Sequence, residues 1–217
     1  ARLAPSEAER ATAKARQELL TPIAKAWSTD VGVEVASMGV QVHGGMGFIE
    51  ETGAAQHYRD ARIAPIYEGT NGIQAIDLIG RKVAMQDGAV MDALCAEMHE
   101  SVQALQGDPA LGGVAAYLEA GVAALERATD WVLQNKGPNA LAGATPYLKL
   151  AGDVVGGWML FRQAQAVAGG DDAWSKSKAA LARVFASQVL AQAPGLAAGV
   201  MEGADDLEAV GAEALGA

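Results

Sequence analysis

The sequence has few of the residues on which disulfide and metal chemistry depend. It contains one cysteine, Cys95, and three histidines among 217 residues. A single cysteine cannot build an internal disulfide framework, and the Cys and His residues show no zinc-type spacing, so we expect no metal site. Low cysteine usage also predicts a reducing, cytoplasmic location.

Basic residues are scarce as well. The chain has 16 Lys and Arg against 26 Asp and Glu, a formal net charge of −10. Binding to a phosphate backbone depends on clustered Lys and Arg, so the composition disfavours a nucleic-acid partner. The N-terminus lacks the apolar segment of a signal peptide, and we find no run that approaches the about 18 apolar residues of a membrane span. The sequence therefore predicts neither a nucleic-acid partner nor a membrane span.

Alternating strand-like runs rich in Val, Thr and aromatic residues are nearly absent, whereas Ala-rich segments carry Leu, Val and Ile at helical spacing. We expect an all-α fold, an up-and-down helical bundle followed by a second helical bundle segment. Ser6 and Glu9 predict a capping box at the start of the first helix. Thr70 is predicted to be the N-cap of the helix that follows it. The predicted helices are 6–19, 22–43, 50–58, one from Thr70 to about Val83, 89–106, 110–135, 140–168 and 172–192. The apolar positions of 22–43, from Ile23 to Val42, predict one buried stripe. The acidic end, 202–217, is expected to be solvated.

The charge balance and the residue pattern of the chain change near residue 86. Residues 1–85 hold 9 basic and 10 acidic side chains, whereas 86–217 hold 7 and 16. We therefore predict two domains, 1–85 and 86–217.

The segment 41–82 carries the candidate chemistry. Gly44 and Gly45 follow a predicted helix and leave bare backbone that a ligand can approach closely. Glu68 lies between Tyr67 and Gly69, just before a helix start. An apolar pocket around such a carboxylate would suit it to act as a general base. Alone, Glu68 is more often a surface acid, and the glycines more often a helix C-cap and turn.

A second charged group in this segment favours a structural reading. Arg59, Asp60 and Arg62 are better interpreted as an ion-pair cluster between helices than as a substrate clamp.

Three motifs in order, QVHGGMGF, YRDARI and IYEGTNGIQ, resemble the C-terminal helical domain of the flavin-dependent acyl-CoA dehydrogenases. The resemblance covers roughly residues 15–85. Residues 86–217 look like the additional helical segment of the members with larger subunits. Family membership implies alpha,beta-dehydrogenation of an acyl-CoA thioester to a trans-2-enoyl-CoA, with hydride transfer to FAD.

The resemblance also assigns roles to individual residues. Glu68 matches the base that removes the α-proton, and its backbone N–H matches one donor to the thioester oxygen, where negative charge develops. Gly69 matches a position against the substrate thioester. The family segment that contacts FAD across a subunit interface is matched by Gln41, Gly44 and Gly45. Another FAD contact, beside the base, is matched by Thr70.

The resemblance implies a longer parent enzyme, a homodimer or homotetramer, with electron-transferring flavoprotein as acceptor. By itself this fragment is expected to be inactive. Two alternatives remain open from the sequence. Residues 86–217 form an interaction or oligomerisation module, or the protein is a DNA-associated dehydrogenase relative with vestigial activity, which the acidic C-terminal part disfavours.

Overall fold

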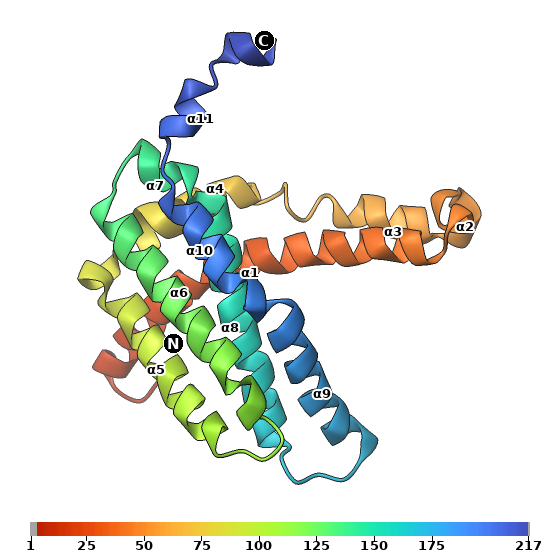
Figure 1. The fold of residues 1–217 in the computed structure, drawn as a ribbon, viewed down its shortest axis with the longest axis vertical. Helices are drawn as coiled ribbons and strands as arrows, with labels where there is room; N and C mark the ends of the chain where they lie inside the picture. The colour runs from red at the N-terminus through yellow and green to blue at the C-terminus, as the bar shows by residue number, and fades with distance from the viewer. Residues whose placement is uncertain (1–3, 217) are drawn as a thin grey trace.

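The structure, a computed structural model, describes residues 4–216 (Figure 1). These residues form helices joined by turns, with no strand among them. The all-α prediction is confirmed. Residues 1–3 and 217, the outer ends of the two predicted domains, lie outside the described residues.

The first helix, α1 (Glu7–Val42), is one continuous element of 36 residues. Its N-terminus has the predicted capping box, since Ser6 Oγ accepts a hydrogen bond from Glu9 N and the Glu9 carboxylate accepts one from Ser6 N. The predicted restart at Thr21 is wrong, because Pro22 lies inside the helix and is buried. Proline removes one backbone hydrogen bond from a helix interior, and burial of this turn offsets that loss.

Beyond its first half, α1 projects from the body of the molecule with α3 running back beside it (Figure 1). We call this projection, residues 31–61, the arm; it includes α2 (Gly45–Phe48), the 3-10 turn Glu50–Thr52 and α3 (Ala54–Ala61). The predicted buried stripe of α1 continues only to Ile23, with Trp27 half-buried, whereas Val35, Met38 and Val42 are 60%, 61% and 85% exposed. The prediction fails on the arm because α2 and α3 pack beside α1 there but leave these three side chains exposed.

After the arm the chain turns through 62–70 and re-enters the body. The next elements are α4 (Asn71–Asp77), a π-helical turn (Leu78–Lys82) and a 3-10 turn (Met85–Gly88). Thr70 is the N-cap of α4, as predicted, because its Oγ1 accepts a hydrogen bond from Ile73 N at 3.4 Å.

The rest of the chain forms a helical bundle. Its four long helices agree with prediction to within five residues at each end: α5 (Ala89–Gln106), α6 (Ala115–Gln134), α8 (Ala144–Ala166) and α9 (Ala173–Gln188). The start of the predicted helix 140–168 is a separate helix, α7 (Pro138–Ala142), and two helices were not predicted, α10 (Ala193–Met201) and α11 (Asp205–Ala209). The bundle also contains the 3-10 turns Gly112–Val114, Leu190–Gln192 and Ala212–Leu215. α10 packs on α6 and α8. The predicted solvated end is exposed over Asp205–Val210.

A single hydrophobic core runs through the body, from Leu19 and Ile23 of α1 to Phe161 of α8. α1 is locked to α8 by Trp27, whose Nε1 donates to the buried carboxylate of Asp153 at 2.8 Å. The indole leaves no room for a side chain on α8, since a Cβ at Gly152 would lie 2.2 Å from Trp27 Cδ1. The glycine therefore allows the close approach of α1 and α8.

One helical stretch, Ala173–Met201, is long and apolar enough to cross a membrane by length and composition. The expectation that no segment approaches this requirement was wrong, because many small Ala residues raise the hydropathy without forming a bulky apolar run. The stretch is interrupted by the 3-10 turn at Leu190, and Leu190, Ala193 and Ala197 are fully buried in the core. Its most apolar part is 28% buried, and these buried residues are its contribution to the core.

A buried thiol, Cys95, and a buried phenol, Tyr147, predict a loss of stability at alkaline pH. Burial, with a smaller effect of nearby acids such as Glu126, raises the pKa of Cys95 from its ordinary 9.0 to about 12. Burial also raises the pKa of Tyr147, opposed by its hydrogen bond with Thr129. Above pH 9.0 the unfolded chain releases the Cys95 proton that the folded chain keeps, so the unfolded state is favoured as pH rises.

We expect urea unfolding between pH 9.0 and about 12 to give an unfolding free energy that falls with pH. The Cys95→Ala variant should lose up to about 1.4 kcal/mol per pH unit of that slope, the contribution of one proton. An identical slope in the variant and the wild type would contradict the assignment of a raised pKa to Cys95.

Candidate functional site

The loop between α3 and α4, residues 62–70, presents Glu68 on an unusual backbone. Glu68 has φ +53° and Gly69 has φ +83°, so two consecutive residues lie in the left-handed region. The loop is closed by Asn71 N, which donates to Pro65 O at 2.9 Å. Left-handed φ is costly for a non-glycine residue, so this conformation depends on the contacts around it.

Glu68 itself is exposed in this chain. Its flanking residues Ile66 and Tyr67 are 50% and 49% exposed, so the apolar pocket expected around the carboxylate is not formed by its neighbours in sequence. The peptide oxygen of Glu68 accepts a hydrogen bond from Gln74 Nε2 at 3.2 Å. Among the described residues its amide N–H has no protein acceptor, so it can donate to a ligand.

The two residues after Glu68 also have defined surroundings. Gly69 combines its positive φ with a tight neighbour, since a Cβ there would lie 3.1 Å from Gln74 Nε2. The Thr70 hydroxyl uses an oxygen lone pair to cap α4, which leaves its proton available for donation outwards.

Sequence reasoning missed the residues of α1 that hold this loop. Lys25 Nζ donates to Gly69 O at 2.9 Å and to Asn71 Oδ1 at 2.7 Å, and it lies 5.7 Å from the centre of the Tyr67 ring. Lys25 is 44 residues from Gly69 in sequence, so no local pattern predicts the contact. Its other partner, Asn71, does lie in the IYEGTNGIQ motif, and that position is the one local hint that Asn71 belongs to the site.

The other predicted site residues lie far from Glu68 within this chain. Gln41 is near the end of α1, and Gly44 and Gly45 begin the turn into α2 at the tip of the arm. Gln41 follows Lys25 by 16 residues on the same helix, which at 1.5 Å per residue places it about 24 Å further along the axis. The structure therefore does not bring these three residues to the Glu68 loop of the same chain.

The backbone at the tip of the arm is open. Gly44 has φ +59°, and a Cβ at Gly44 or Gly45 would meet no other atom within 4 Å. Gly44 N donates to Gln41 O at 3.0 Å, so the donors that a flat, polar cofactor can approach here are the Gly45 N–H and the Gln41 side-chain amide. The open backbone and the amide donors at the tip of the arm fit a cofactor such as a flavin nucleotide.

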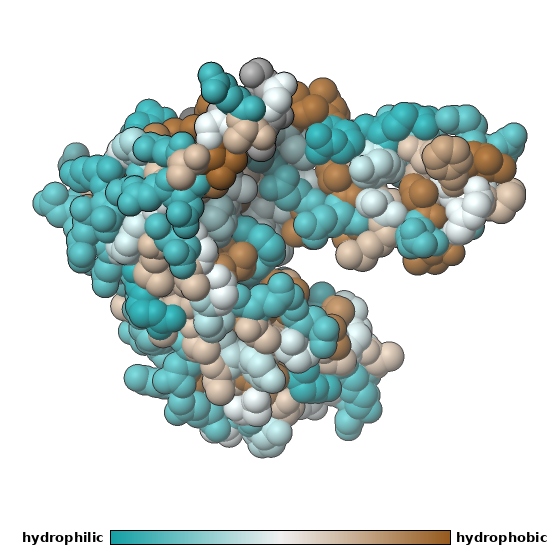
Figure 2. Space-filling model, turned by 45° about the horizontal axis from the view of Figure 1, so that its top comes forward, coloured by the Kyte–Doolittle hydropathy of each residue, from teal (hydrophilic) through white to brown (hydrophobic). Residues whose placement is uncertain are grey.

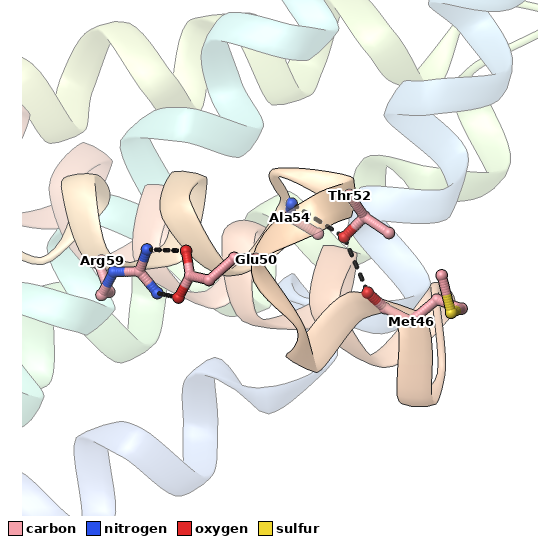
Figure 3. A network of polar contacts seen from close by, with 5 residues as sticks. All are labelled: Met46, Glu50, Thr52, Ala54 and Arg59. Atoms are coloured by element: carbon pink, nitrogen blue, oxygen red, sulfur yellow. Dashed lines mark hydrogen bonds and ion pairs between the residues drawn. The ribbon is translucent and has the colours of Figure 1, made fainter.

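The arm tip is braced by a polar network (Figure 3). Arg59 donates two hydrogen bonds to the Glu50 carboxylate, at 2.7 and 3.0 Å, and Thr52 Oγ1 donates to Met46 O at 2.8 Å. The predicted ion-pair cluster is wrong in its members, because Arg59 pairs with Glu50 of the 3-10 turn, and within residues 4–216 Asp60 and Arg62 form no ion pair. No cluster of His, Cys, Asp or Glu suited to a metal ion occurs in that range.

Comparison with known proteins matches both halves of the chain. Residues 2–84 match the family model described as "Acyl-CoA dehydrogenase, C-terminal domain", and residues 94–210 match "Acetyl-CoA dehydrogenase C-terminal like". A crystal structure of an acyl-CoA dehydrogenase complexed with FAD from Bacillus anthracis superposes with a TM-score of 0.68 at 21% identity. It covers 88% of this chain and 34% of its own, and it shows that the two share a fold.

Two curated relatives are similar in sequence. The chain is 47% identical over 201 residues to the 3-methylmercaptopropionyl-CoA dehydrogenase of Ruegeria pomeroyi, covering 87% of this chain and 33% of the relative. It is 32% identical over 170 residues to a butyryl-CoA dehydrogenase of Syntrophomonas wolfei, covering 76% and 28%. The chain thus spans about a third of the length of these relatives.

Proposed function

The chain belongs to the acyl-CoA dehydrogenase family, and from this premise we propose that it is the C-terminal part of an FAD-dependent enzyme that oxidises an acyl-CoA thioester. The observation that carries the proposal is the Glu68 loop, where an exposed carboxylate and a free amide N–H stand on one residue of a fixed turn. The limited coverage of the relatives supports a longer parent protein.

In the proposed reaction Glu68 accepts the proton from the α-carbon of the thioester. The α-proton is weakly acidic, so its removal requires stabilisation of the charge that develops on the thioester oxygen. The Glu68 N–H can donate to that oxygen, and Gly69 leaves the approach free of a side chain. The chemistry that FAD would supply when bound is acceptance of the hydride from the β-carbon, which together with loss of the α-proton to Glu68 would leave a carbon–carbon double bond.

Two sets of residues are proposed to hold FAD. Thr70 donates its free hydroxyl proton beside the base, and the arm tip offers Gln41, Gly44 and Gly45. Because these sets lie at opposite ends of the arm, we propose that they serve two cofactors in a homo-oligomer, the arm reaching the site of a second subunit. This separation also supports the proposal that the chain alone is inactive.

The experiment uses the full-length protein with FAD, without oxygen, and two thioesters, 3-methylmercaptopropionyl-CoA and butyryl-CoA. The expected result is bleaching of the flavin absorbance and a product lighter by two hydrogens. If neither thioester bleaches the flavin, although FAD is bound, the proposed function is wrong for both acyl groups. Electron-transferring flavoprotein is the proposed acceptor and is tested by adding it to the reduced enzyme.

The exposed apolar side chains of the arm predict that the arm forms a contact between subunits of the enzyme. Figure 2 shows apolar residues on the surface of the arm, and Val42 and Phe48 are 85% and 81% exposed. Apolar surface of this kind marks a contact with another protein surface. We expect Val42→Glu to shift the full-length enzyme to a smaller oligomer in light scattering, because a charge enters the interface.

The matched control is Leu207→Glu on α11, which adds the same charge at an apolar side chain that is 65% exposed. Its mass should equal that of the wild type. An unchanged mass for Val42→Glu would contradict a role of the arm in assembly.

A further inference from the structure

Side chains of other elements hold the peptide oxygens of the two residues of the Glu68 loop that have left-handed φ, Glu68 and Gly69. Gln74 Nε2 of α4 donates to Glu68 O at 3.2 Å, and Lys25 Nζ of α1 donates to Gly69 O at 2.9 Å. These contacts fix the orientation of the two peptide planes that follow the Glu68 Cα. Asn71 N, which donates to Pro65 O at 2.9 Å, closes the loop before Glu68, so the left-handed conformation is maintained by contacts at both ends.

Asn71 connects the loop to α1 through its side-chain amide. Its Oδ1 accepts from the Lys25 ammonium at 2.7 Å, and the two hydrogens of its Nδ2 are shared among Ala26 O at 3.1 Å, Thr29 Oγ1 at 3.0 Å and Asp30 Oδ1 at 2.7 Å. The cation on one side and the carboxylate on the other allow only one orientation of the amide, oxygen towards Lys25 and nitrogen towards Asp30. A carboxylate at this position would satisfy Lys25 but repel Asp30 and a backbone carbonyl.

Lys25 has no other described role in the fold. It is half-buried on α1, makes no ion pair among the described residues, and directs its ammonium at Gly69 O, Asn71 Oδ1 and the face of the Tyr67 ring. All of these groups belong to the loop or to the residue that closes it. The side chain is therefore specific to this loop.

We propose that Lys25 and Asn71 are positioning residues for Glu68, holding its loop in the left-handed conformation that aims the carboxylate and the amide N–H at the thioester. The inference rests on the proposed function of Glu68. Neither side chain is required to touch the substrate; both act through the backbone of residues 68–71. Correct placement of a base contributes to rate because small displacements lower the fraction of productive encounters.

The test compares Lys25→Met and Asn71→Asp in the full-length, FAD-loaded enzyme, with the more rapidly oxidised of 3-methylmercaptopropionyl-CoA and butyryl-CoA. We expect kcat to fall by about 10-fold to 30-fold, because the loop relaxes towards ordinary φ values, with KM changed by less than about 3-fold. The isotope effect on kcat with the α-deuterated thioester should rise, because proton removal becomes slower than the other steps. Lys25→Arg, which keeps a cation, should recover most of the activity.

Lys14→Met is the matched control, since Lys14 is an exposed lysine of α1 remote from the loop, and it should behave as the wild type. Wild-type kcat in both Lys25→Met and Asn71→Asp, with Glu68→Gln inactive, would overturn the positioning role and leave the proposed function intact. Activity lost only in proportion to FAD content, with an unchanged isotope effect, would also overturn it. Full activity of Glu68→Gln would overturn the proposed function itself.

Discussion

Replacing Glu68 with Gln in the full-length enzyme is expected to lower kcat by about 1,000-fold, the middle of the range for loss of a positioned general base. Glutamine keeps the size of the side chain and the left-handed backbone, so the turn and the amide N–H should stay in place. It cannot accept the α-proton. Steady-state turnover, FAD content and KM for the thioester are the measurements, and only turnover should change strongly.

Two further variants separate the role of Glu68 from a general effect of acidic residues. Glu68→Asp keeps a carboxylate but withdraws it by one methylene, so its kcat should lie between those of the wild type and Glu68→Gln. Glu119→Gln removes an exposed acid of α6, away from the arm and the loop, and should leave turnover unchanged. Equal losses in Glu119→Gln and Glu68→Gln would show that the effect is not specific to the proposed base.

Gly152→Ala is expected to destabilise the chain by about 3 kcal/mol, the sum of overpacking, a weakened hydrogen bond to a buried charge and a small gain in helix propensity. The added methyl would lie 2.2 to 2.7 Å from three atoms of Trp27, including its Cβ, so the indole cannot simply rotate away. Moving Trp27 also breaks its hydrogen bond to Asp153, which is 2% exposed. The measurement is urea unfolding followed by far-UV circular dichroism.

Two other glycines calibrate this effect. A Cβ at Gly156 would lie 3.0 Å from the far edge of the Trp27 ring, so Gly156→Ala should cost less than Gly152→Ala. A Cβ at Gly199 of α10 meets nothing within 4 Å, and Gly199→Ala should stabilise by up to about 1 kcal/mol through helix propensity. If Gly152→Ala were as stable as Gly199→Ala, the account of how α1 is seated on α8 would be wrong.

The packing of Trp27 against Gly152 also affects the position of the Glu68 loop. Trp27 follows Lys25 by two residues on α1, so a displacement of the helix at Gly152 also moves the ammonium that holds Gly69 O. Gly152→Ala in the full-length enzyme should therefore lower kcat in addition to stability.

Local patterns predicted the elements whose determinants are local. The capping box of Ser6 and Glu9 and the Thr70 cap depend on residues three positions apart, and both are present. The long helices from 89 to 188 followed from spacing and from breaks at Gly, Pro and Asp. Glu68 came from the motif around it, since a lone exposed acid carries no signal of catalysis.

The features that sequence reasoning missed depend on distant partners. Pro22 signalled a helix start, but packing of its turn into the core carries α1 through it. The apolar positions of the arm have the same period as those of a buried stripe, and periodicity does not say what covers a face. The contacts of Trp27 with Asp153 and of Lys25 with Gly69 join residues 126 and 44 positions apart, where no pattern in one sequence connects them.

The most direct test of the account is exchange of the α-hydrogens of a bound thioester with deuterium oxide. A 3-thiaacyl-CoA serves as the probe, because it has sulfur in place of the β-carbon and cannot give up a hydride, so only proton transfer at the α-carbon is observed. In the full-length enzyme with FAD, we predict that the wild type catalyses this exchange and that Glu68→Gln does not, although it binds the probe. Exchange by Glu68→Gln at the wild-type rate would contradict the assignment of Glu68 as the base.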